Sequence, residues 1–262
     1  MRVAVLVKQV PDSWAVKRLD AGLRVNRDAC DRVLNDLDEY AIEQALVWQE
    51  SVGAEVVLVS MGPAVAEEAL RRGLSMGADS AVLVSDAALA GADALITARV
   101  LAAAVAKVAP DVVLCGVATT DGGMGVVPSM VAQMLGWPGL TNVSSVSVSS
   151  AGARSSVVAA RANESVQVEL EAALPAVVSV AEKINTPRYP NFKGIMAAKK
   201  KTVDVWSLSD LGVSVGDSAS SAAAVLAGVV DMPARSGGVV VTDAAGDSVS
   251  GLVAFLESRK VI

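Results

Sequence analysis

The chain of 262 residues has no histidine, only two cysteines and only 3% aromatic residues. Without histidine, catalytic triads and metal sites that depend on an imidazole are excluded, as is the usual general base near neutral pH. Cys30 and Cys115 do not form a CxxC pair, so neither a disulfide framework nor a zinc site is indicated. A reducing, cytoplasmic compartment is therefore the expectation. The sequence predicts a protein that breaks few bonds by itself.

Long apolar runs are also missing, although 53% of the residues are hydrophobic and the mean hydropathy is +0.49. The best candidate for a membrane span, residues 95–109, contains Arg99 and Lys107. Since a span needs about 20 apolar residues, no transmembrane helix is predicted. The apolar run at the N-terminus is likewise shorter than the core of about 7 to 15 residues of a signal peptide. A net charge of −6 argues against a general nucleic-acid binder.

Apolar, valine-rich runs alternate with segments of helical periodicity along the first two thirds of the chain. The predicted strands are 3–7, 55–60, 80–84, 111–115 and 175–181, and the predicted helices are 36–50, 64–76, 92–108 and 124–135. Asn35, with Asp38 three residues later, is the predicted N-cap of the first helix, in the manner of a capping box. This alternation predicts an α/β fold, with a doubly wound, mostly parallel sheet of the Rossmann-like, nucleotide-binding type.

The residue pattern and composition of the sequence change twice in the second half of the chain. Residues 141–172 contain short alternating segments, which predict antiparallel strands inserted into the sheet architecture. After residue 212, Gly, Ser and Ala dominate, and a helix is predicted at 247–260. We therefore expect a nucleotide-binding domain at 1–212 and a C-terminal arm at 213–262. Such an arm either packs on a partner or is flexible.

The carboxyl ends of the predicted strands form the expected ligand crevice, which lies between the first and fourth strands of a doubly wound sheet. Residues 119–128 (TTDGGMGVVP) follow the fourth strand and precede a helix, so their glycines and free N–H groups are a candidate phosphate cradle. Lys8 either contributes charge to a phosphate or is a solvated strand end. Asp121 either caps the next helix or binds a ligand hydroxyl. Met61 borders the crevice or simply packs.

A second candidate element is the loop 186–201 (TPRYPNFKGIMAAKKK), which carries two aromatic residues beside three lysines. Pro187 and Pro190 place Tyr189 and Phe192 in a loop or at its edge. The residue types alone fit either a docking element or an ordinary connection.

The chain resembles the beta subunit of electron transfer flavoprotein over about residues 2–213. The motifs that carry the resemblance are VLVKQVPD near the N-terminus, NDLDEYAIEQA, VSMGPAVAEEALRRGLSMGAD, LGWP, LPAVVSVAEKIN, PRYPNFKGIMAAKKK and DLGV. Such subunits are not themselves enzymes. They pair with an alpha subunit that holds the redox FAD, contribute a face to that flavin and bind AMP as a structural nucleotide. The heterodimer takes electrons from acyl-CoA and related dehydrogenases, as in fatty acid oxidation, and passes them to a membrane quinone reductase.

The resemblance also implies site residues. Those implied for AMP are Leu6, Lys8, Asn35, Asp36, Leu37, Asp38, Met61, Gly116, Thr119, Thr120, Asp121, Gly122, Gly123, Met124, Gly125, Val126 and Val127. The aromatic residue that faces the flavin matches Trp14 if one residue is inserted, and Ser13 otherwise. Residues implied for partner recognition are Tyr189, Phe192, Ile195, Met196, Lys199, Lys200 and Lys201, with Phe192 at the position of an exposed apolar anchor. No catalytic residue and no metal ligand is implied.

One departure concerns the phosphate loop. Many members have Asn-Gln-Thr-Gly where this chain has Gly-Val-Val-Pro at 125–128, so main-chain N–H groups would have to form the cradle. Electron-bifurcating relatives hold a second FAD in this crevice instead of AMP, and neither group's pattern is intact here. A stand-alone nucleotide-binding regulatory domain and a nucleotide-dependent dehydrogenase are further alternatives. The lack of GxGxxG and of histidine weighs against the dehydrogenase.

Overall fold

The computed structural model describes residues 1–151, 154–162, 164–214, 222, 224, 226–230, 232–235, 237–238, 240 and 248–262. Residues 1–226 and 227–262 form two separate units. The second unit contains the helix α7 (Ser248–Ser258), where the sequence predicts a helix at 247–260. Much of the expected arm lies outside the described residues. Within the described part, no helix is long and apolar enough to cross a membrane.

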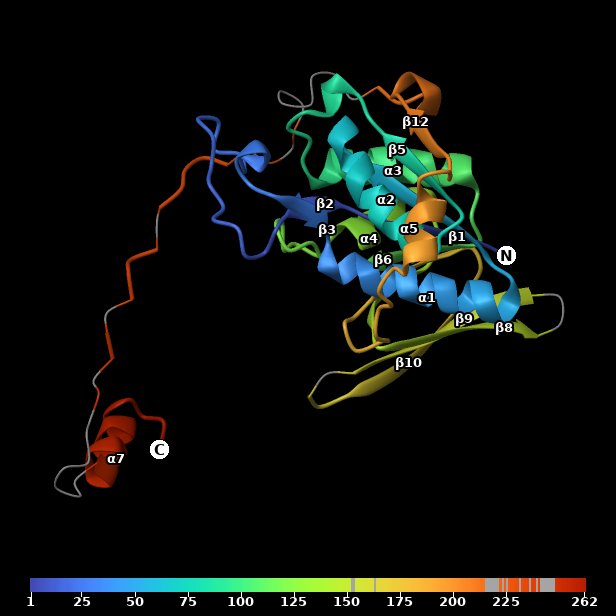
Figure 1. Ribbon diagram of the computed structural model, residues 1–262. Helices are drawn as coiled ribbons and strands as arrows, with labels where there is room; N and C mark the ends of the chain where they lie inside the picture. The colour runs from blue at the N-terminus through green and yellow to red at the C-terminus, as the bar shows by residue number, and fades with distance from the viewer. Residues whose placement is uncertain are drawn as a thin grey trace. The chain divides into compact units, whose positions relative to one another are not determined.

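A parallel sheet of seven strands organises the first unit, in the order β12-β5-β4-β1-β6-β11-β7 (Figure 1). The strands are β1 (Arg2–Leu6), β4 (Glu55–Met61), β5 (Ser80–Val84), β6 (Val112–Gly116), β7 (Gly139–Val143), β11 (Ala176–Val180) and β12 (Val203–Trp206). Because β1 pairs with both β4 and β6, the chain reverses its direction of travel across the sheet at β1 and β6. The predicted crevice between the first and fourth strands is therefore confirmed as the switch point of the sheet.

Two apolar cores cover the two faces of this sheet, as in doubly wound folds. One core joins the sheet to α1 (Asp36–Val52) and α2 (Glu67–Met76), and its largest fully buried side chains include Ile42, Leu70 and Leu74. The other joins it to α3 (Ala94–Val108) and α4 (Val127–Leu135). Successive apolar residues of a strand alternate between the two cores: Val3 and Val5 face one core and Ala4 the other. This arrangement explains why the strands read as continuous apolar runs.

The antiparallel strands form a sheet of their own, β8 (Ser145–Ala151), β9 (Arg154–Ala162) and β10 (Gln167–Ala173). The predicted inserted antiparallel segment is therefore confirmed. The segment that begins at residue 141 belongs to β7, which pairs parallel with β11. Val157 and Ala159 bury one face of the small sheet against the core that contains α1. A short pair, β2 (Gln9–Pro11) and β3 (Arg32–Leu34), was not predicted.

Helix starts differ most from the predictions. The helix predicted at 64–76 begins with a 3-10 turn, so α2 starts at Glu67. The helix predicted at 124–135 starts at Val127. Asn35 does occupy the N-cap position of α1, but its side chain makes no capping bond. The predicted capping box is wrong, because the Asn35 side chain is used elsewhere.

Candidate functional site

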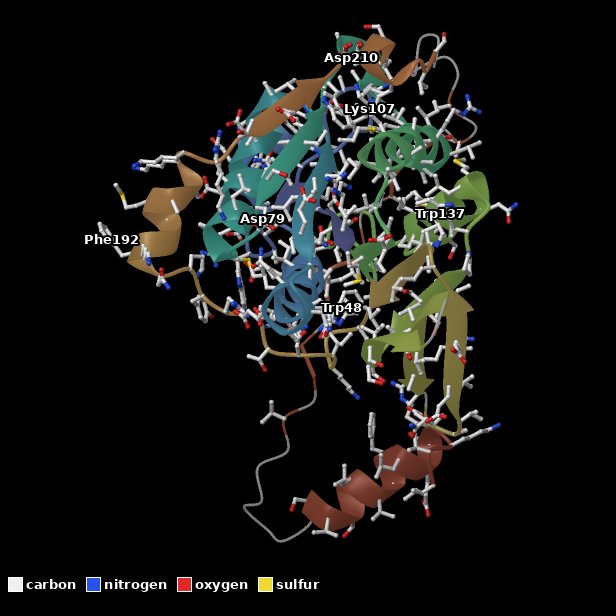
Figure 2. All side chains as sticks on the ribbon, turned by 90° about the vertical axis from the view of Figure 1, so that its right-hand side faces the viewer. Trp48, Asp79, Lys107, Trp137, Phe192 and Asp210 are labelled. Carbon is white, nitrogen blue, oxygen red and sulfur yellow. The ribbon has the colours of Figure 1, made fainter. Side chains whose placement is uncertain are left out.

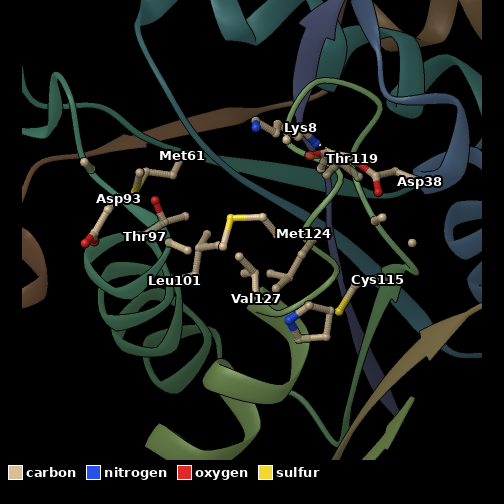
Figure 3. Close-up of a pocket in the computed structure, with 18 of the residues that line it drawn as sticks. Lys8, Asp38, Met61, Asp93, Thr97, Leu101, Cys115, Thr119, Met124 and Val127 are labelled. Atoms are coloured by element: carbon tan, nitrogen blue, oxygen red, sulfur yellow. Dashed lines mark hydrogen bonds between the residues drawn. The ribbon is translucent and has the colours of Figure 1, made fainter. Parts of the chain in front are cut away.

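A cavity of about 440 Å³ lies at the carboxyl ends of β1 and β6, where the sheet changes direction. Its volume falls within the range of about 300 to 1,000 Å³ that is usual for small-molecule sites. Figure 3 shows Asp93, Thr97 and Leu101 of the α3 side across the cavity from Lys8 and Thr119. The cavity thus has polar groups at both ends and apolar side chains, such as Met124, between them.

The glycine-rich loop between β6 and α4 forms one wall of this cavity. Gly125 has a φ of 63°, and an added Cβ there would lie 3.1 Å from the Val117 carbonyl oxygen. Within the described residues, the backbone N–H groups of Met124, Gly125 and Val126 donate no hydrogen bond. They precede the N-terminus of a nine-residue helix. This backbone is suited to an anionic group.

Asp121 links the loop to two cations. Its buried carboxylate accepts a hydrogen bond from Lys8 Nζ at 2.9 Å and another from Arg27 Nη2. Burial opposes ionisation, but the charge of Lys8 and the hydrogen bonds from Arg27 outweigh it and hold the Asp121 pKa well below its usual range. Asp121 therefore neither caps α4 nor has a free carboxylate for a ligand hydroxyl. Lys8 is not a simple solvated strand end.

Asn35 ties the start of α1 to the same loop. Its Nδ2 donates to the Ala118 carbonyl at 3.0 Å, and its Oδ1 accepts from the Thr120 N–H at 3.1 Å. Gly116 allows this close approach, because an added Cβ would lie 2.6 Å from Asp38 Oδ1 and 2.7 Å from the Leu37 carbonyl oxygen. Residues 35–38 therefore hold the loop between β6 and α4, which forms one wall of the cavity, in position.

Asp38 lines the cavity and has a strongly raised pKa. Its carboxylate is buried and accepts the Lys8 N–H at 2.8 Å. Burial raises the pKa of Asp38 from 3.8 to about 7, although hydrogen bonds from Asn35 and from the Lys8 backbone favour the charged form. Burial also raises the pKa of the neighbouring Cys115 thiol, so this thiol is unreactive at neutral pH.

The raised pKa of Asp38 predicts a pH dependence of stability. Because the folded protein binds this proton more tightly than the unfolded chain, the contribution is fully present below pH 3.8 and is lost as the pH rises through about 7. Thermal unfolding between pH 5.5 and 8 should show wild-type protein losing stability relative to Asp38→Asn, whose side chain cannot ionise. Equal pH profiles for the two proteins would contradict this assignment.

The residues implied for the nucleotide fall into two groups. Those that line the cavity are Leu6, Lys8, Asp38, Met61, Gly116, Thr119, Gly122, Met124, Gly125 and Val127. Those implied but not in its lining are Asn35, Asp36, Leu37, Thr120, Asp121, Gly123 and Val126. Asn35 and Asp121 instead hold residues that do line it. Trp14 lies outside the cavity on the connection between β2 and β3, with 96% of its surface exposed.

Sequence reasoning missed a large part of the cavity. Lining residues that were not predicted are Arg27, Pro63, Leu89, Ala90, Gly91, Ala92, Asp93, Ala94, Thr97 and Leu101. The segment 89–97 follows β5, and the rule that ligands bind at carboxyl ends of strands could have included it. No local signal identifies Arg27, which comes from the connection between β2 and β3.

The second predicted element contains a helix, α5 (Phe192–Ala198), capped by the Asn191 side chain, which accepts the Gly194 N–H at 2.8 Å. Phe192 is 79% exposed and, with Ile195 and Met196, forms an apolar face at helical spacing. Figure 2 shows Phe192 on the outer side of the helix, directed away from the sheet. Tyr189 is 88% exposed. We call Tyr189, Phe192, Ile195 and Met196 the α5 patch. Lys199 and Lys200 are exposed beside it.

Helix α2 fixes the position of α5, which lies beside it (Figure 1). Arg71 Nη1 donates to the carbonyl oxygens of Ala198 at 2.8 Å and Lys201 at 2.7 Å. Lys201 Nζ in turn donates to the carbonyls of Gly77 and Ala78, so this lysine differs from Lys199 and Lys200 and points back to the fold. The exposed apolar face of α5 therefore belongs to a helix that hydrogen bonds fix to the rest of the fold.

Arg188 fixes the preceding loop on α1. Its guanidinium donates to both carboxylate oxygens of Glu43 at 2.8 Å and to Glu50 at 2.5 Å. Paired, charge-assisted bonds of this kind are strong and directional. The hydrogen bonds that Arg188 donates to Glu43 and Glu50 raise the pKa of Arg188 above its ordinary value. The loop 186–201 is therefore an ordered surface element.

Similarity to known proteins bears on both the cavity and the loop 186–201. The family model described as Electron transfer flavoprotein domain matches residues 22–211. The chain is 40% identical to the electron transfer flavoprotein subunit beta of Mycobacterium leprae, with 99% of each chain covered. The chain belongs to the electron transfer flavoprotein beta-subunit family. Its role is therefore in electron transfer, and membership implies an alpha-subunit partner.

Two further relatives match over their full length. The electron transfer flavoprotein subunit beta of Thermoanaerobacterium thermosaccharolyticum is 34% identical over the full length of both chains. The caffeyl-CoA reductase-Etf complex subunit CarD of Acetobacterium woodii is 35% identical, also over the full length of both chains. The relatives thus include subunits of more than one kind of flavoprotein complex.

Proposed function

We propose that the chain is the beta subunit of a heterodimeric, cytoplasmic electron transfer flavoprotein that binds one AMP structurally. An alpha subunit holds the FAD, and the beta subunit helps to enclose it, with Trp14 on the flavin's face. The heterodimer accepts electrons from acyl-CoA and related dehydrogenases and passes them toward a membrane quinone reductase. The beta subunit itself carries electrons without breaking bonds.

The cavity at the switch point is the observation that supports AMP. Free N–H groups of the glycine loop lie at one end, and Arg27 Nη1 is buried without a hydrogen-bond partner in the described structure. Both features fit a phosphate, because a buried donor is destabilising until it finds an acceptor. The apolar stretch with Met61, Leu101 and Met124 fits a base. The residues present therefore fit AMP although residues 125–128 lack amide and hydroxyl side chains.

A bifurcating-type subunit with a second FAD is the alternative, favoured by the departure of residues 125–128 from the common AMP loop. A stand-alone nucleotide-binding domain is a further alternative. Nucleotides released from the purified heterodimer decide between them. AMP with one FAD supports the proposal, two FAD without AMP supports bifurcation, and a stable monomer with no alpha subunit supports a stand-alone domain.

The α5 patch supports the docking part of the proposal. Its apolar side chains are exposed on a rigid helix, and exposed apolar patches commonly mark interaction sites. Lys199 and Lys200 beside it favour acidic partner surfaces. We infer that Phe192 inserts into an apolar pocket of the dehydrogenase, while Tyr189 braces the loop.

Gly194 supplies a test of the helix position. An added Cβ would lie 2.4 Å from the Ser75 carbonyl oxygen of α2, so Gly194→Ala should displace α5. Since overpacking typically costs about 1 to 3 kcal/mol, we expect the dehydrogenase KM to rise severalfold with flavin content unchanged. Gly228→Ala, where an added Cβ meets nothing within 4 Å, is the control. Wild-type kinetics for Gly194→Ala would show that the position of α5 is not critical.

A further inference from the structure

Arg27 lies at the boundary of two cavities. It lines both the 440 Å³ cavity and a neighbouring one of about 380 Å³, together with Lys8, Met61 and Pro63. Its Nη2 donates to Asp121, whereas its Nη1 is buried and has no hydrogen-bond partner among the described residues. One nitrogen of this guanidinium is thus held by Asp121, and the other has no acceptor within the described structure.

The carboxylates near Arg27 do not supply a hydrogen-bond acceptor for its Nη1. Asp28 pairs with Arg32 at 2.9 Å, and Asp20 accepts the backbone N–H groups of Gly22 and Arg24. Asp121 is already shared between Lys8 and Arg27. The carboxyl of Asp38 also interacts with Lys8, but burial raises its pKa to about 7, so near neutral pH it is only partly ionised. Lys8 and Arg27 are therefore not fully neutralised by Asp121 and Asp38, and an anion from outside the chain completes the cluster.

The cavity is also electrically asymmetric. Lys8 and Arg27 belong to its wall, as does the loop whose free N–H groups precede α4. Figure 3 shows Asp93 and Thr97 on the side opposite Lys8. A ligand with one anionic end and one neutral end therefore has a single favourable orientation, with its anionic end toward the cations and the glycine loop.

We propose that Arg27 is the residue of this cavity that binds the ligand's phosphate, with its guanidinium donating to a phosphate oxygen; this rests on the proposed function, since it takes an adenine nucleotide as the ligand. Asp121 acts as a positioning residue, because it accepts the hydrogen bond from Nη2 and so fixes the guanidinium at the cavity wall. A guanidinium presents several donors in one plane, so it binds a carboxylate and a phosphate at the same time.

Titration calorimetry on the heterodimer, stripped of its crevice nucleotide, tests this with AMP and adenosine as probes. In Arg27→Met, AMP affinity should fall at least tenfold, while adenosine affinity stays within twofold of wild type. Arg27→Lys keeps a charge for Asp121 but has only one nitrogen, so it should show the same selective loss if the methionine variant does not fold. Arg32→Met, at a residue that does not line the 440 Å³ cavity and pairs with Asp28, should bind both probes normally.

Wild-type AMP affinity in both Arg27 variants would overturn the role of Arg27 and leave the proposed function intact. Equal losses of AMP and adenosine would also overturn it, because they would show that Arg27 shapes the cavity without selecting the phosphate. If the stripped wild-type heterodimer bound neither probe, the AMP proposal itself would fail, and the role of Arg27 with it.

Discussion

Replacing Phe192 by alanine is expected to lower kcat/KM for flavin reduction by the partner dehydrogenases about thirtyfold, with FAD content unchanged. An aromatic anchor at the centre of an interface contributes about 2 kcal/mol or more, and each 1.36 kcal/mol corresponds to a factor of ten. Phe192 is suited to this role because its ring is 79% exposed on a helix that Arg71 holds in place. Stopped-flow reduction of the heterodimer by several dehydrogenases measures the effect.

Val205→Ala is the matched control, since Val205 is an apolar side chain on β12 that is 57% exposed and lies outside the α5 patch. It should leave every rate unchanged. If Phe192→Ala also leaves the rates of all dehydrogenases unchanged, docking does not take place through this helix.

Replacing Gly116 by alanine is expected to destabilise the protein by about 3 kcal/mol and to release the crevice nucleotide. The new Cβ would overlap Asp38 Oδ1 at 2.6 Å and the Leu37 carbonyl oxygen at 2.7 Å. Neither atom can move easily, because Asn35 ties this end of α1 to Ala118 and Thr120. Thermal unfolding together with nucleotide analysis measures both effects.

Gly237→Ala is the control for this substitution, because an added Cβ there meets nothing within 4 Å. It should keep both the unfolding temperature and the nucleotide. A Gly116→Ala variant with wild-type stability would mean that α1 and β6 do not pack as closely as the structure shows.

The sheet was predictable because its signals are local. Runs such as 80–84 and 111–115 are apolar on both faces, and they match β5 and β6 closely. The crevice followed from strand order. The strand β12 was not predicted, because its exposed Asp204 and Val205 at the edge of the sheet give no continuous apolar run. For Asn35 the N-cap position was predicted correctly, but the capping bond was not formed. Its side chain bonds to Ala118 and Thr120 instead.

The candidate site was predictable only in part, because half of it depends on contacts between distant segments. The glycine loop was identified from residues 119–128, whereas Arg27 meets Asp121 across 94 positions of sequence. Lys201 looks like its neighbours Lys199 and Lys200 in the sequence, but it reaches Gly77 and Ala78. Charge runs and glycines are visible in a sequence; the pairing of a particular cation with a particular acceptor is not.

The nucleotide content of the heterodimer, purified with its alpha subunit, tests the central claim most directly. Denaturation, followed by chromatographic identification and counting of the released nucleotides, should give one FAD and one AMP per heterodimer. Two FAD and no AMP would contradict the AMP assignment, and a stable monomer that carries its nucleotide without any alpha subunit would contradict the heterodimer.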